Sequence, residues 1–431
     1  MSPQLQLLPP IPPPVGLYVR PGWNDHLILQ QLVVEGRAPT GFVFDARYGD
    51  RQRDLWEAAV DANLDAVLDP NAQELWTPAG RQLSGLHGVA WSSVADQGEF
   101  SLRGAEGEAL VSLLADHIAA NHFTSVLAPT HYLQGPADRQ LGVDLHLARV
   151  LRRALDQRGL QGVRLYYPLA LPARSLALPA NRAHLVRQFG DMDIDAIWLR
   201  LHPFGTSASG PIALRRYIDI CLDLQRLGVP LVAERTGTVG IALLSFNAVG
   251  GIECGVTLGE RFDAGRLLHM QSRTGDPYSH PAMVYLAAID TFIGTVEGRQ
   301  LLARRAVKAA LGCPDGRCCR HGPEDMVRDP RRHAVIQRLR EVEQVGGLPP
   351  HRRPQEYLDH LRNAGDIAVR LAANHPVLEK ARRRLDSWRG TLSILPDEIV
   401  PLTGPVPAVG RRLPRVVRLS RPRPVPTATK G

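Results

Sequence analysis

The sequence predicts an α/β protein in which a (β/α)8 barrel, or TIM barrel, is followed by a C-terminal helical subdomain. Its first 260 residues contain eight short apolar runs, most of which end in a charged or polar residue, with amphipathic helical patterns between most of them. Eight strand-then-helix units are the number that closes such a barrel. The length of 431 residues suits a barrel of roughly 250 residues with an appendage.

The expected strands are the apolar runs themselves. They cover residues Gly16–Arg20, Gly41–Asp45, Asp65–Asp69, Phe123–Pro129, Val163–Leu169, Asp195–His202, Val229–Glu234 and Gly250–Val256. Apolar residues spaced by about 3.6 positions predict helices over Ala105–Ala120, Ala137–Arg158 and Pro211–Leu227. The irregular stretch 75–103 leaves the C-terminal end of the third strand, so we interpret it as a lid or substrate loop.

The chain after the eighth run is expected to be helical. A long helix is predicted over His280–Leu311, then a cysteine-rich loop, then helices near Pro330–Glu343, Gln355–Ala373 and Pro376–Arg389. The predicted organisation is therefore a proline-rich lead-in (1–14), a barrel (15–311), a basic Cys/His-containing helical subdomain (312–400) and a disordered Pro/Arg-rich tail (401–431).

The net charge of +8 is concentrated in the C-terminal third. Residues 299–400 carry 20 Lys and Arg against 13 Asp and Glu, and residues 401–431 carry seven and none. A basic folded part with a basic tail favours contact with a polyanion such as RNA or DNA. A solvated basic surface is the plainer interpretation, and a homodimer is one of the states that the sequence allows.

Composition and hydropathy exclude a membrane protein, because no apolar run approaches the ~18 residues that a spanning helix needs. The N-terminus lacks a basic segment and an apolar core, so it is not expected to be a signal peptide. Five cysteines, an odd number, fit a reducing compartment, and we therefore expect a cytoplasmic protein.

Charged and polar residues gather where the expected strands end, which is where TIM-barrel enzymes carry their active sites. These residues are Arg20, Asp45, Arg47, Asp69, Asn71, Thr130, His131, His202, Glu234, Arg235 and Glu253. Several carboxylates at one mouth need a cation, an arginine or a cationic substrate to balance them. Each carboxylate taken alone also fits a helix cap or an ion pair with Arg47 or Arg235.

The segment ERTGTVG, from Glu234 to Gly240, joins the seventh run to a helix. Glycines such as Gly237 let backbone amides approach a ligand, and a helix N-terminus favours an anion. Tight strand-to-helix turns require glycine in any case, so both interpretations stand.

The segment CPDGRCCRH predicts a structural zinc site formed by Cys313, Cys318, Cys319 and His321. Three thiolates and an imidazole satisfy tetrahedral zinc. Adjacent cysteines rarely both bind one metal, so one of the pair is a candidate spectator, with His333 or another histidine completing the set. A fortuitous cysteine cluster is the alternative.

Taken together, these features resemble the tRNA-guanine transglycosylase superfamily, including relatives that insert 7-deazaguanines into DNA. Asp45, in FVFDARYGD, stands where the family has a carboxylate in an Asp-Ser-Gly-Gly-like segment. The order in LVAERTGTVGIALLSFNAVGGIECGV matches the family, with Glu253–Cys254 in place of Asp-Cys. A Cys/Cys/Cys/His set follows in a basic region. The Gly-Gly after Asp45 is missing, and the zinc spacing differs.

The resemblance, which spans about residues 16–400, implies a base-exchange reaction on RNA or DNA. It implies Glu253 as nucleophile, Asp45 as general acid/base and Asp69 as a base-recognition group, with the target base leaving the stack to enter the barrel mouth. Residues expected to bind substrate are Arg47, Asn71, His131, His202, Glu234, Arg235 and Gly237.

Two other functions remain open from the residues. One is a metal- or cofactor-dependent barrel enzyme acting on a small molecule, with His131, His202 and the carboxylates as metal ligands. The other is a non-catalytic nucleic-acid or protein partner built on a barrel scaffold. The fold alone does not separate the three.

Overall fold

The computed structural model describes residues 16–77, 86–92, 105–205, 209–265, 282–371 and 375–395. The proline-rich lead-in, the tail 401–431 and most of the stretch 75–103 lie outside these residues, so those three predictions are not tested here.

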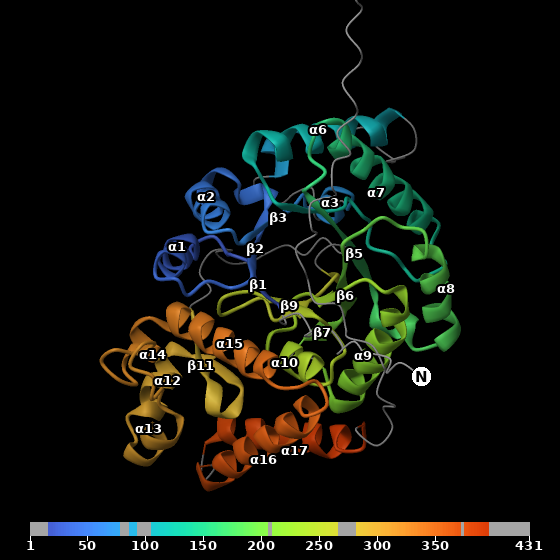
Figure 1. The fold of residues 1–431 in the computed structure, drawn as a ribbon. Helices are drawn as coiled ribbons and strands as arrows, with labels where there is room; N and C mark the ends of the chain where they lie inside the picture. Colours follow the sequence, from blue (N-terminus) through green and yellow to red (C-terminus); the bar gives the residue numbers. More distant parts are fainter. Residues whose placement is uncertain are drawn as a thin grey trace, which may run out of the picture.

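Eight parallel strands close into a barrel in the order β1-β2-β3-β4-β5-β6-β8-β9, which confirms the predicted fold class (Figure 1). They are β1 (Gly16–Val19), β2 (Gly41–Asp45), β3 (Asp65–Asp69), β4 (Ser125–Leu127), β5 (Arg164–Pro172), β6 (Ala196–His202), β8 (Leu231–Ala233) and β9 (Gly251–Cys254). Each predicted run contributes one strand. The barrel closes where β1 pairs with β9, with Tyr18 opposite Glu253.

The barrel interior is layered, because alternate residues of a strand face the same side. One layer is apolar and fully buried, and it consists of Tyr18, Val43, Val67, Leu127, Tyr166, Ala196, Trp198 and Val232. Two residues further along five of these segments stand Arg20, Asp45, Asp69, Arg200 and Glu234, all buried. The strand period therefore places an ionic layer directly above the apolar layer, toward the C-terminal ends of the strands, which we call the mouth.

Helices surround the barrel (Figure 1). They are α1 (His26–Val34), α2 (Arg53–Asp61), α3 (Ala72–Leu75), α6 (Ala105–Asn121), α7 (Arg139–Gln157), α8 (Pro179–Phe189), α9 (Pro211–Leu224) and α10 (Gly237–Ser245). Short 3-10 turns are η1 (Ala46–Tyr48), η2 (Asp50–Gln52), η3 (Leu86–Gly88), η4 (Ala173–Leu176) and η5 (Gln225–Leu227), and β7 (Phe204–Gly205) pairs with β10 (Arg261–Phe262). In α7 the predicted apolar stripe is buried, and Asp138 caps the helix by accepting from the Gln140 N–H at 3.0 Å.

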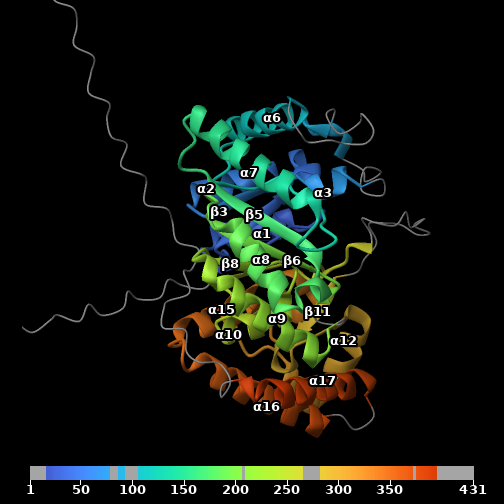
Figure 2. The same ribbon diagram turned by 90° about the vertical axis from the view of Figure 1, so that its right-hand side faces the viewer.

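A β-hairpin and a group of helices follow the barrel. They are β11 (Met283–Leu286), η6 (Ala287–Ile289), β12 (Thr291–Gly294), α12 (Thr295–Leu302), α13 (Arg305–Leu311), α14 (Asp325–Arg328), α15 (Pro330–Gly347), α16 (Arg353–Leu371) and α17 (Pro376–Leu392). Figure 2 shows α16 and α17 at the opposite end of the molecule from α6. None of the helices in the described residues is both long and apolar enough to cross a membrane.

The single long helix predicted over His280–Leu311 is wrong. Within its described part, from residue 282, the chain forms the β11–β12 hairpin and then two short helices. All of Val284, Tyr285 and Leu286 are buried, so the strand lacks the polar alternation that reveals a half-exposed strand. Asp290, in the left-handed region at φ 50°, turns the chain between the two strands.

Candidate active site and metal cluster

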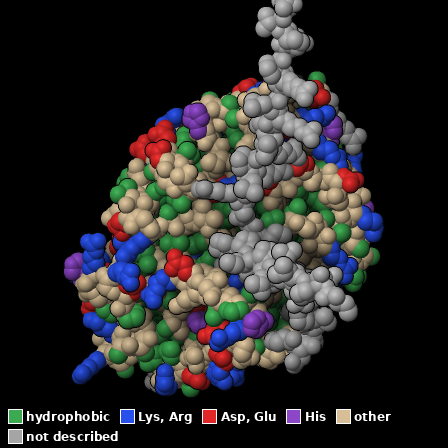
Figure 3. All heavy atoms as spheres, in the orientation of Figure 1, with side chains coloured by type: hydrophobic (Ala, Val, Ile, Leu, Met, Phe, Trp, Pro, Cys, Tyr) green, Lys and Arg blue, Asp and Glu red, His purple; other side chains and the backbone are tan. Residues whose placement is uncertain are grey.

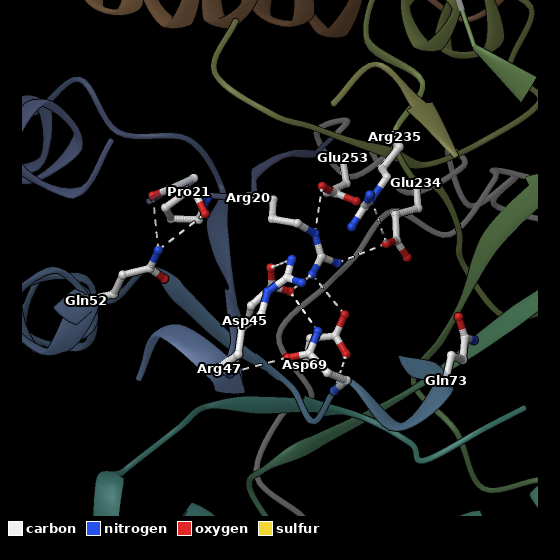
Figure 4. A network of polar contacts seen from close by, with 12 residues as sticks. Arg20, Pro21, Asp45, Arg47, Gln52, Asp69, Gln73, Glu234, Arg235 and Glu253 are labelled. Carbon is white, nitrogen blue, oxygen red and sulfur yellow. Dashed lines mark hydrogen bonds and ion pairs between the residues drawn. The ribbon is translucent and has the colours of Figure 1, made fainter. Parts of the chain in front are cut away.

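Arg20 lies at the centre of the mouth and contacts four carboxylates (Figure 4). Its guanidinium donates to Asp45, to Asp69 Oδ2 (2.8 Å), to Glu234 Oε1 (2.9 Å) and to Glu253 Oε1 (3.2 Å). Only 7% of Arg20 is exposed. One guanidinium thus links the ends of β2, β3, β8 and β9, and the structure brings the three predicted catalytic carboxylates together.

Arg200, on β6, is a second buried cation in this cluster. It donates to Asp69 Oδ2 and to Glu234 Oε2, both at 2.5 Å, and to Gln73 Oε1 at 3.0 Å. Asp69 and Glu234 are therefore each shared between two arginines. Sequence reasoning missed Arg200 because it stands inside an apolar strand, although its spacing of two from Trp198 marks an inward position.

Asp45 has further partners on its own side of the mouth. Arg47 Nη2 donates to Asp45 Oδ2 at 3.1 Å, and Asn71 Nδ2 donates to Asp45 Oδ1 at 3.2 Å. The Asn71 N–H donates to Asp69 Oδ1 at 2.9 Å. Asn71 adopts a left-handed conformation at φ 54°, which an asparagine tolerates better than most residues. Arg47 and Asn71, predicted to bind substrate, thus hold the carboxylates in this structure.

Glu253 differs from its neighbours because only one of its oxygens is paired. Oε1 accepts from Arg20, while Oε2 is buried and has no hydrogen-bond partner among the described residues. Burial raises the pKa of Glu253 to about 7, and the negative charge of Glu234 adds to this, although Arg20 acts in the opposite direction. Glu253 is therefore a carboxyl group that exchanges a proton near neutral pH.

Asp45 and Asp69 are held ionised. Burial alone would raise the pKa of Asp45, but Arg20 and Arg47 together hold it well below its usual range. For Asp69, burial is outweighed by Arg200 and Arg20, and its pKa is also lowered. Two adjacent strand ends thus present charged carboxylates beside a third carboxyl group that is easily protonated.

The balance of charges at the mouth also indicates that one carboxyl group is protonated. The mouth contains the carboxyl groups of Asp45, Asp69, Glu74, Glu234 and Glu253 and the guanidinium groups of Arg20, Arg47, Arg200 and Arg235. The cluster is neutral when one carboxyl group is protonated. Glu253 and Glu74 are the two candidates to hold that proton, because the pKa of each is raised, that of Glu74 by burial and by Asp69.

The two predicted histidines lie near the mouth but are not arranged as metal ligands. His131 Nδ1 is 2.5 Å from Asp144 Oδ1 on α7, and the ring stacks on Trp76 at 4.0 Å between centroids. His202 Nδ1 accepts from the Ala264 N–H at 2.9 Å, and burial lowers the pKa of His202.

The ERTGTVG turn is filled by another part of the chain. Gly237 has φ 48°, and a Cβ there would come within 2.0 Å of the Glu260 carboxylate. Glu260 also contacts Thr238 Oγ1 at 3.4 Å and accepts from Arg338 Nη2 at 2.8 Å. The anion expected at this helix N-terminus is therefore the protein's own Glu260, and Gly237 makes room for it. The Arg235 Nε is 3.9 Å from Glu234 Oε1.

Three cysteines and His333 form a metal-binding arrangement next to strand β11 of the hairpin. The ligand atoms of Cys313, Cys318, Cys319 and His333 all lie within 4.8 Å of one another, and all four residues are buried. The Cys318 and Cys319 sulfurs are 3.8 Å apart, and His333 Nδ1 is 3.3 Å from Cys318 Sγ and 3.5 Å from Cys319 Sγ. A tetrahedron with zinc–sulfur bonds of about 2.3 Å has edges of about 3.8 Å, so this donor set fits zinc.

The other nitrogen of His333 is also held, because Nε2 is 2.9 Å from the Tyr285 carbonyl oxygen on β11. Such a contact fixes the ring orientation of a metal-bound histidine. His321, predicted as the fourth ligand, lies outside the cluster, since its side chain is 75% exposed and pairs with Asp325. Within the described ranges, no second group of His, Cys, Asp or Glu side chains is arranged to hold a metal ion.

No family model and no curated protein matches the chain. Among solved structures it is similar to an endo-1,4-beta-xylanase of Penicillium canescens, with 12% identity, a TM-score of 0.37, and coverage of 55% of this chain and 82% of that one. It is also similar to a beta-mannanase of Bacteroides ovatus, with 10% identity, a TM-score of 0.38, and coverage of 59% and 83%. The carboxyl transferase domain of Rhizobium etli pyruvate carboxylase matches at 9% identity and a TM-score of 0.37, over 90% of this chain and 62% of that one. At such low sequence identities and TM-scores, the similarity to these structures gives no information about the activity of this chain.

Fold and site together place the chain in a general class. It is a (β/α)8 barrel with a buried cluster of ionisable groups at its mouth and a Cys/Cys/Cys/His arrangement that fits a metal ion.

Proposed function

We propose that this protein is a base-exchange enzyme of the transglycosylase type, which replaces a base in RNA or DNA. The observation that carries the proposal is Glu253, a buried carboxyl group that titrates near neutral pH beside the ionised Asp45 and Asp69. Cleaving and remaking an N-glycosidic bond through a covalent intermediate can use one charged carboxylate to attack the sugar and one protonated carboxyl group to protonate the leaving base.

The reaction divides into two mirrored steps. A carboxylate oxygen forms a bond to C1′ as the C1′–N bond breaks, and the leaving base takes a proton from the carboxylic acid. An incoming base then attacks C1′, transfers its N–H proton to the second carboxylate and releases the first. The ionisation of the site favours Asp45 as the attacking carboxylate and Glu253 as the proton-transfer group, which reverses the roles implied by the family resemblance.

A nucleic-acid substrate is supported by the basic region around the start of α15, which packs against α1. Arg331 and Arg332, at the start of α15, pair with Asp25 (3.0 Å) and Glu35 (2.6 Å) of the first strand–helix unit. The exposed arginines Arg320 and Arg328 lie on the same part of the chain. A metal ion bound by Cys313, Cys318, Cys319 and His333 would hold this region in place, and its role would be structural.

The test is exchange of a labelled base into nucleic acid. The protein is incubated with RNA or DNA and labelled guanine or 7-deazaguanine, and label retained in the polymer is counted. Asp45→Asn and Glu253→Gln should abolish incorporation, whereas Glu343→Gln, at an exposed position of α15, should not. Mass spectrometry of acid-quenched protein should place a glycosyl adduct on Asp45. An adduct on Glu253 would restore the roles implied by the resemblance, and failure of every base to exchange would overturn the proposal.

The burial of the cluster favours a second candidate, a barrel enzyme acting on a small molecule. Arg20, Asp45 and Glu253 are almost inaccessible in this structure, and a compact substrate would disturb them least. The same exchange assay with free nucleosides separates the two. Exchange into nucleosides but not into RNA or DNA would assign a small-molecule substrate.

A further inference from the structure

A second network of buried charges lies between α15 and α10, and the reaction proposed above uses none of its members. Arg338, which is 3% exposed, donates from Nη2 to Glu260 Oε1 at 2.8 Å and to Thr238 Oγ1 at 3.1 Å. Its Nη1 donates to Glu341 Oε2 at 2.8 Å. The guanidinium also lies 4.9 Å from the centroid of the Tyr285 ring, and the Tyr285 hydroxyl donates to Glu341 Oε1 at 2.7 Å.

The burial of Arg338 distinguishes it from the charged groups at the surface. Figure 3 shows charged side chains of both signs intermixed in the lower part of the view, where Figure 1 places α15 to α17. Ion pairs between such exposed side chains stabilise a protein little. Taking a guanidinium out of water is costly, and its contacts have to compensate. For Arg338 these contacts connect α15 to the barrel, because Thr238 and Glu260 follow its last two strands, β8 and β9.

Glu260 fills the turn between β8 and α10. Its carboxylate occupies the space in which a side chain at Gly237 would lie, and it contacts Thr238 at the start of the helix. In the same turn, the Thr236 N–H donates to the carbonyl oxygen of Glu253 at 3.2 Å. The turn that Glu260 fills therefore contacts the backbone of Glu253 at the end of β9.

The chain between Glu253 and Glu260 is short and tightly folded. Glu260 follows Glu253 by seven positions, and a Cβ at Gly255 would clash with the Leu258 carbonyl oxygen. Directly after Glu260, β10 pairs with β7. A segment that is held at both ends has little freedom, so a displacement of Glu260 would be transmitted to the end of β9.

The position of Glu253 determines its ionisation. The charged groups that face it are Arg20 from β1, Arg200 from β6, and Glu234 and Arg235 from the end of β8. Burial is the largest influence and raises the pKa of Glu253 to about 7, while Arg20 acts in the opposite direction. A movement that admits water to the buried Oε2 would therefore lower the pKa towards the usual range of a glutamate, because burial outweighs the contact with Arg20.

We propose that Arg338 is a positioning residue for Glu253. It holds Glu260 in the turn at the start of α10, and this contact fixes the end of β9 so that Glu253 remains buried. Arg338 lies on the same helix as His333 of the metal cluster, and both contact Tyr285, so a bound metal ion would hold the helix from which Arg338 reaches the barrel. The position of Glu253 is independent of the reaction, whereas a role for Arg338 in base exchange rests on the proposed function.

The test follows the protonated carboxyl group of Glu253 by infrared spectroscopy. Each protein is titrated together with its own Glu253→Gln variant, and the difference between the two spectra isolates the carboxyl band of Glu253. The midpoint should be about 7 in the wild type. Arg338→Met should lower it by about one pH unit or more, a tenfold loss of proton affinity, because water reaches the carboxylate. Arg352→Met, at an exposed position after α15, is the matched control and should leave the midpoint unchanged.

A second variant separates positioning from a loss of folding. Glu260→Gln keeps the size of the side chain and removes its charge, so it should lower the midpoint in the same direction as Arg338→Met. The two shifts should not add in the double variant, because both changes break the same contact. If Arg338→Met does not fold, the result for Glu260→Gln decides.

The outcomes separate this inference from the proposed function. An unchanged midpoint in folded Arg338→Met and Glu260→Gln would overturn the positioning role, and base exchange by the wild type would leave the proposed function standing. Where the wild type exchanges bases, the pH profile of exchange in Arg338→Met should shift with the midpoint, since Glu253 transfers the proton. A shifted midpoint in a protein that exchanges no base would support the positioning role and overturn the proposed function.

Discussion

Arg20 Nε donates to Glu253 Oε1 at 3.2 Å, and the other oxygen of Glu253 remains buried without a partner among the described residues. The single ion pair does not offset the burial of the carboxylate, and the pKa of Glu253 rises to about 7. The same arginine helps to hold the pKa of Asp45 far below normal. One guanidinium thus leaves two carboxyl groups in opposite ionisation states.

The unusual pKa of Glu253 should appear in the stability of the protein. Its pKa rises from about 4.5 in the unfolded chain to about 7 in the folded one, so its contribution to stability is complete below pH 4.5 and is lost as the pH rises through 7. Glu253→Gln should remove this loss. We therefore compare the free energy of unfolding of the variant with that of wild type, by urea denaturation at each pH. The difference between the two should shift by about 3 kcal/mol in favour of the variant as the pH rises from 4 to 8. An identical pH dependence in both proteins would contradict the assignment, and Glu343→Gln serves as control.

Removing Arg20 should leave four carboxylates with too little positive charge. We expect Arg20→Met to lower the free energy of unfolding by about 3–5 kcal/mol at pH 7. Without Arg20, the pKa values of Asp45 and Asp69 rise, so protonation at lower pH should relieve the repulsion and narrow the difference from wild type. Arg226→Met, at a side chain that is 72% exposed, should change stability by less than about 0.5 kcal/mol. A loss that grows toward low pH would argue against this explanation.

Metal binding should depend on His333 and not on His321. We expect about one zinc per chain by elemental analysis. His333→Ala and Cys318→Ser should lose most of the metal and unfold at lower temperature, whereas His321→Ala should retain it. Retention of zinc by His333→Ala together with its loss from His321→Ala would show that the loop ligates the metal differently.

Gly237 should tolerate no side chain. A Cβ there would lie 2.0 Å from the Glu260 carboxylate, which Arg338 holds in place, and φ is 48°. Gly237→Ala should therefore lower the free energy of unfolding by about 2 kcal/mol or more. Gly316→Ala, whose Cβ would meet nothing within 4 Å, is the matched control and should be nearly neutral. Thermal unfolding followed by circular dichroism would measure both, and equal stabilities would show that Glu260 moves aside at little cost.

The strands could be predicted from the sequence because apolar runs ending in polar residues are a local signal. The carboxylates at Asp45, Asp69 and Glu253 were found for the same reason. Arg200 was missed because an inward-facing cation within an apolar strand looks like an isolated exception. His333 was outweighed by His321 because proximity in sequence is visible, whereas the return of α15 to the cysteines depends on tertiary packing. The β11–β12 hairpin was missed because burial of both faces of β11 removes the alternation that marks a strand.

The contact between Arg20 and Glu253 also bears on how the protein is made. These residues are 233 positions apart, and β1 reaches its second neighbour, β9, only when both ends of the barrel have left the ribosome. Until β9 pairs with β1, Glu253 has neither the burial nor the Arg20 contact of the folded barrel, so its pKa is that of an exposed carboxyl group. The ability of Glu253 to carry a proton at neutral pH therefore arises only with the last strand of the barrel, and a truncated nascent chain cannot have it.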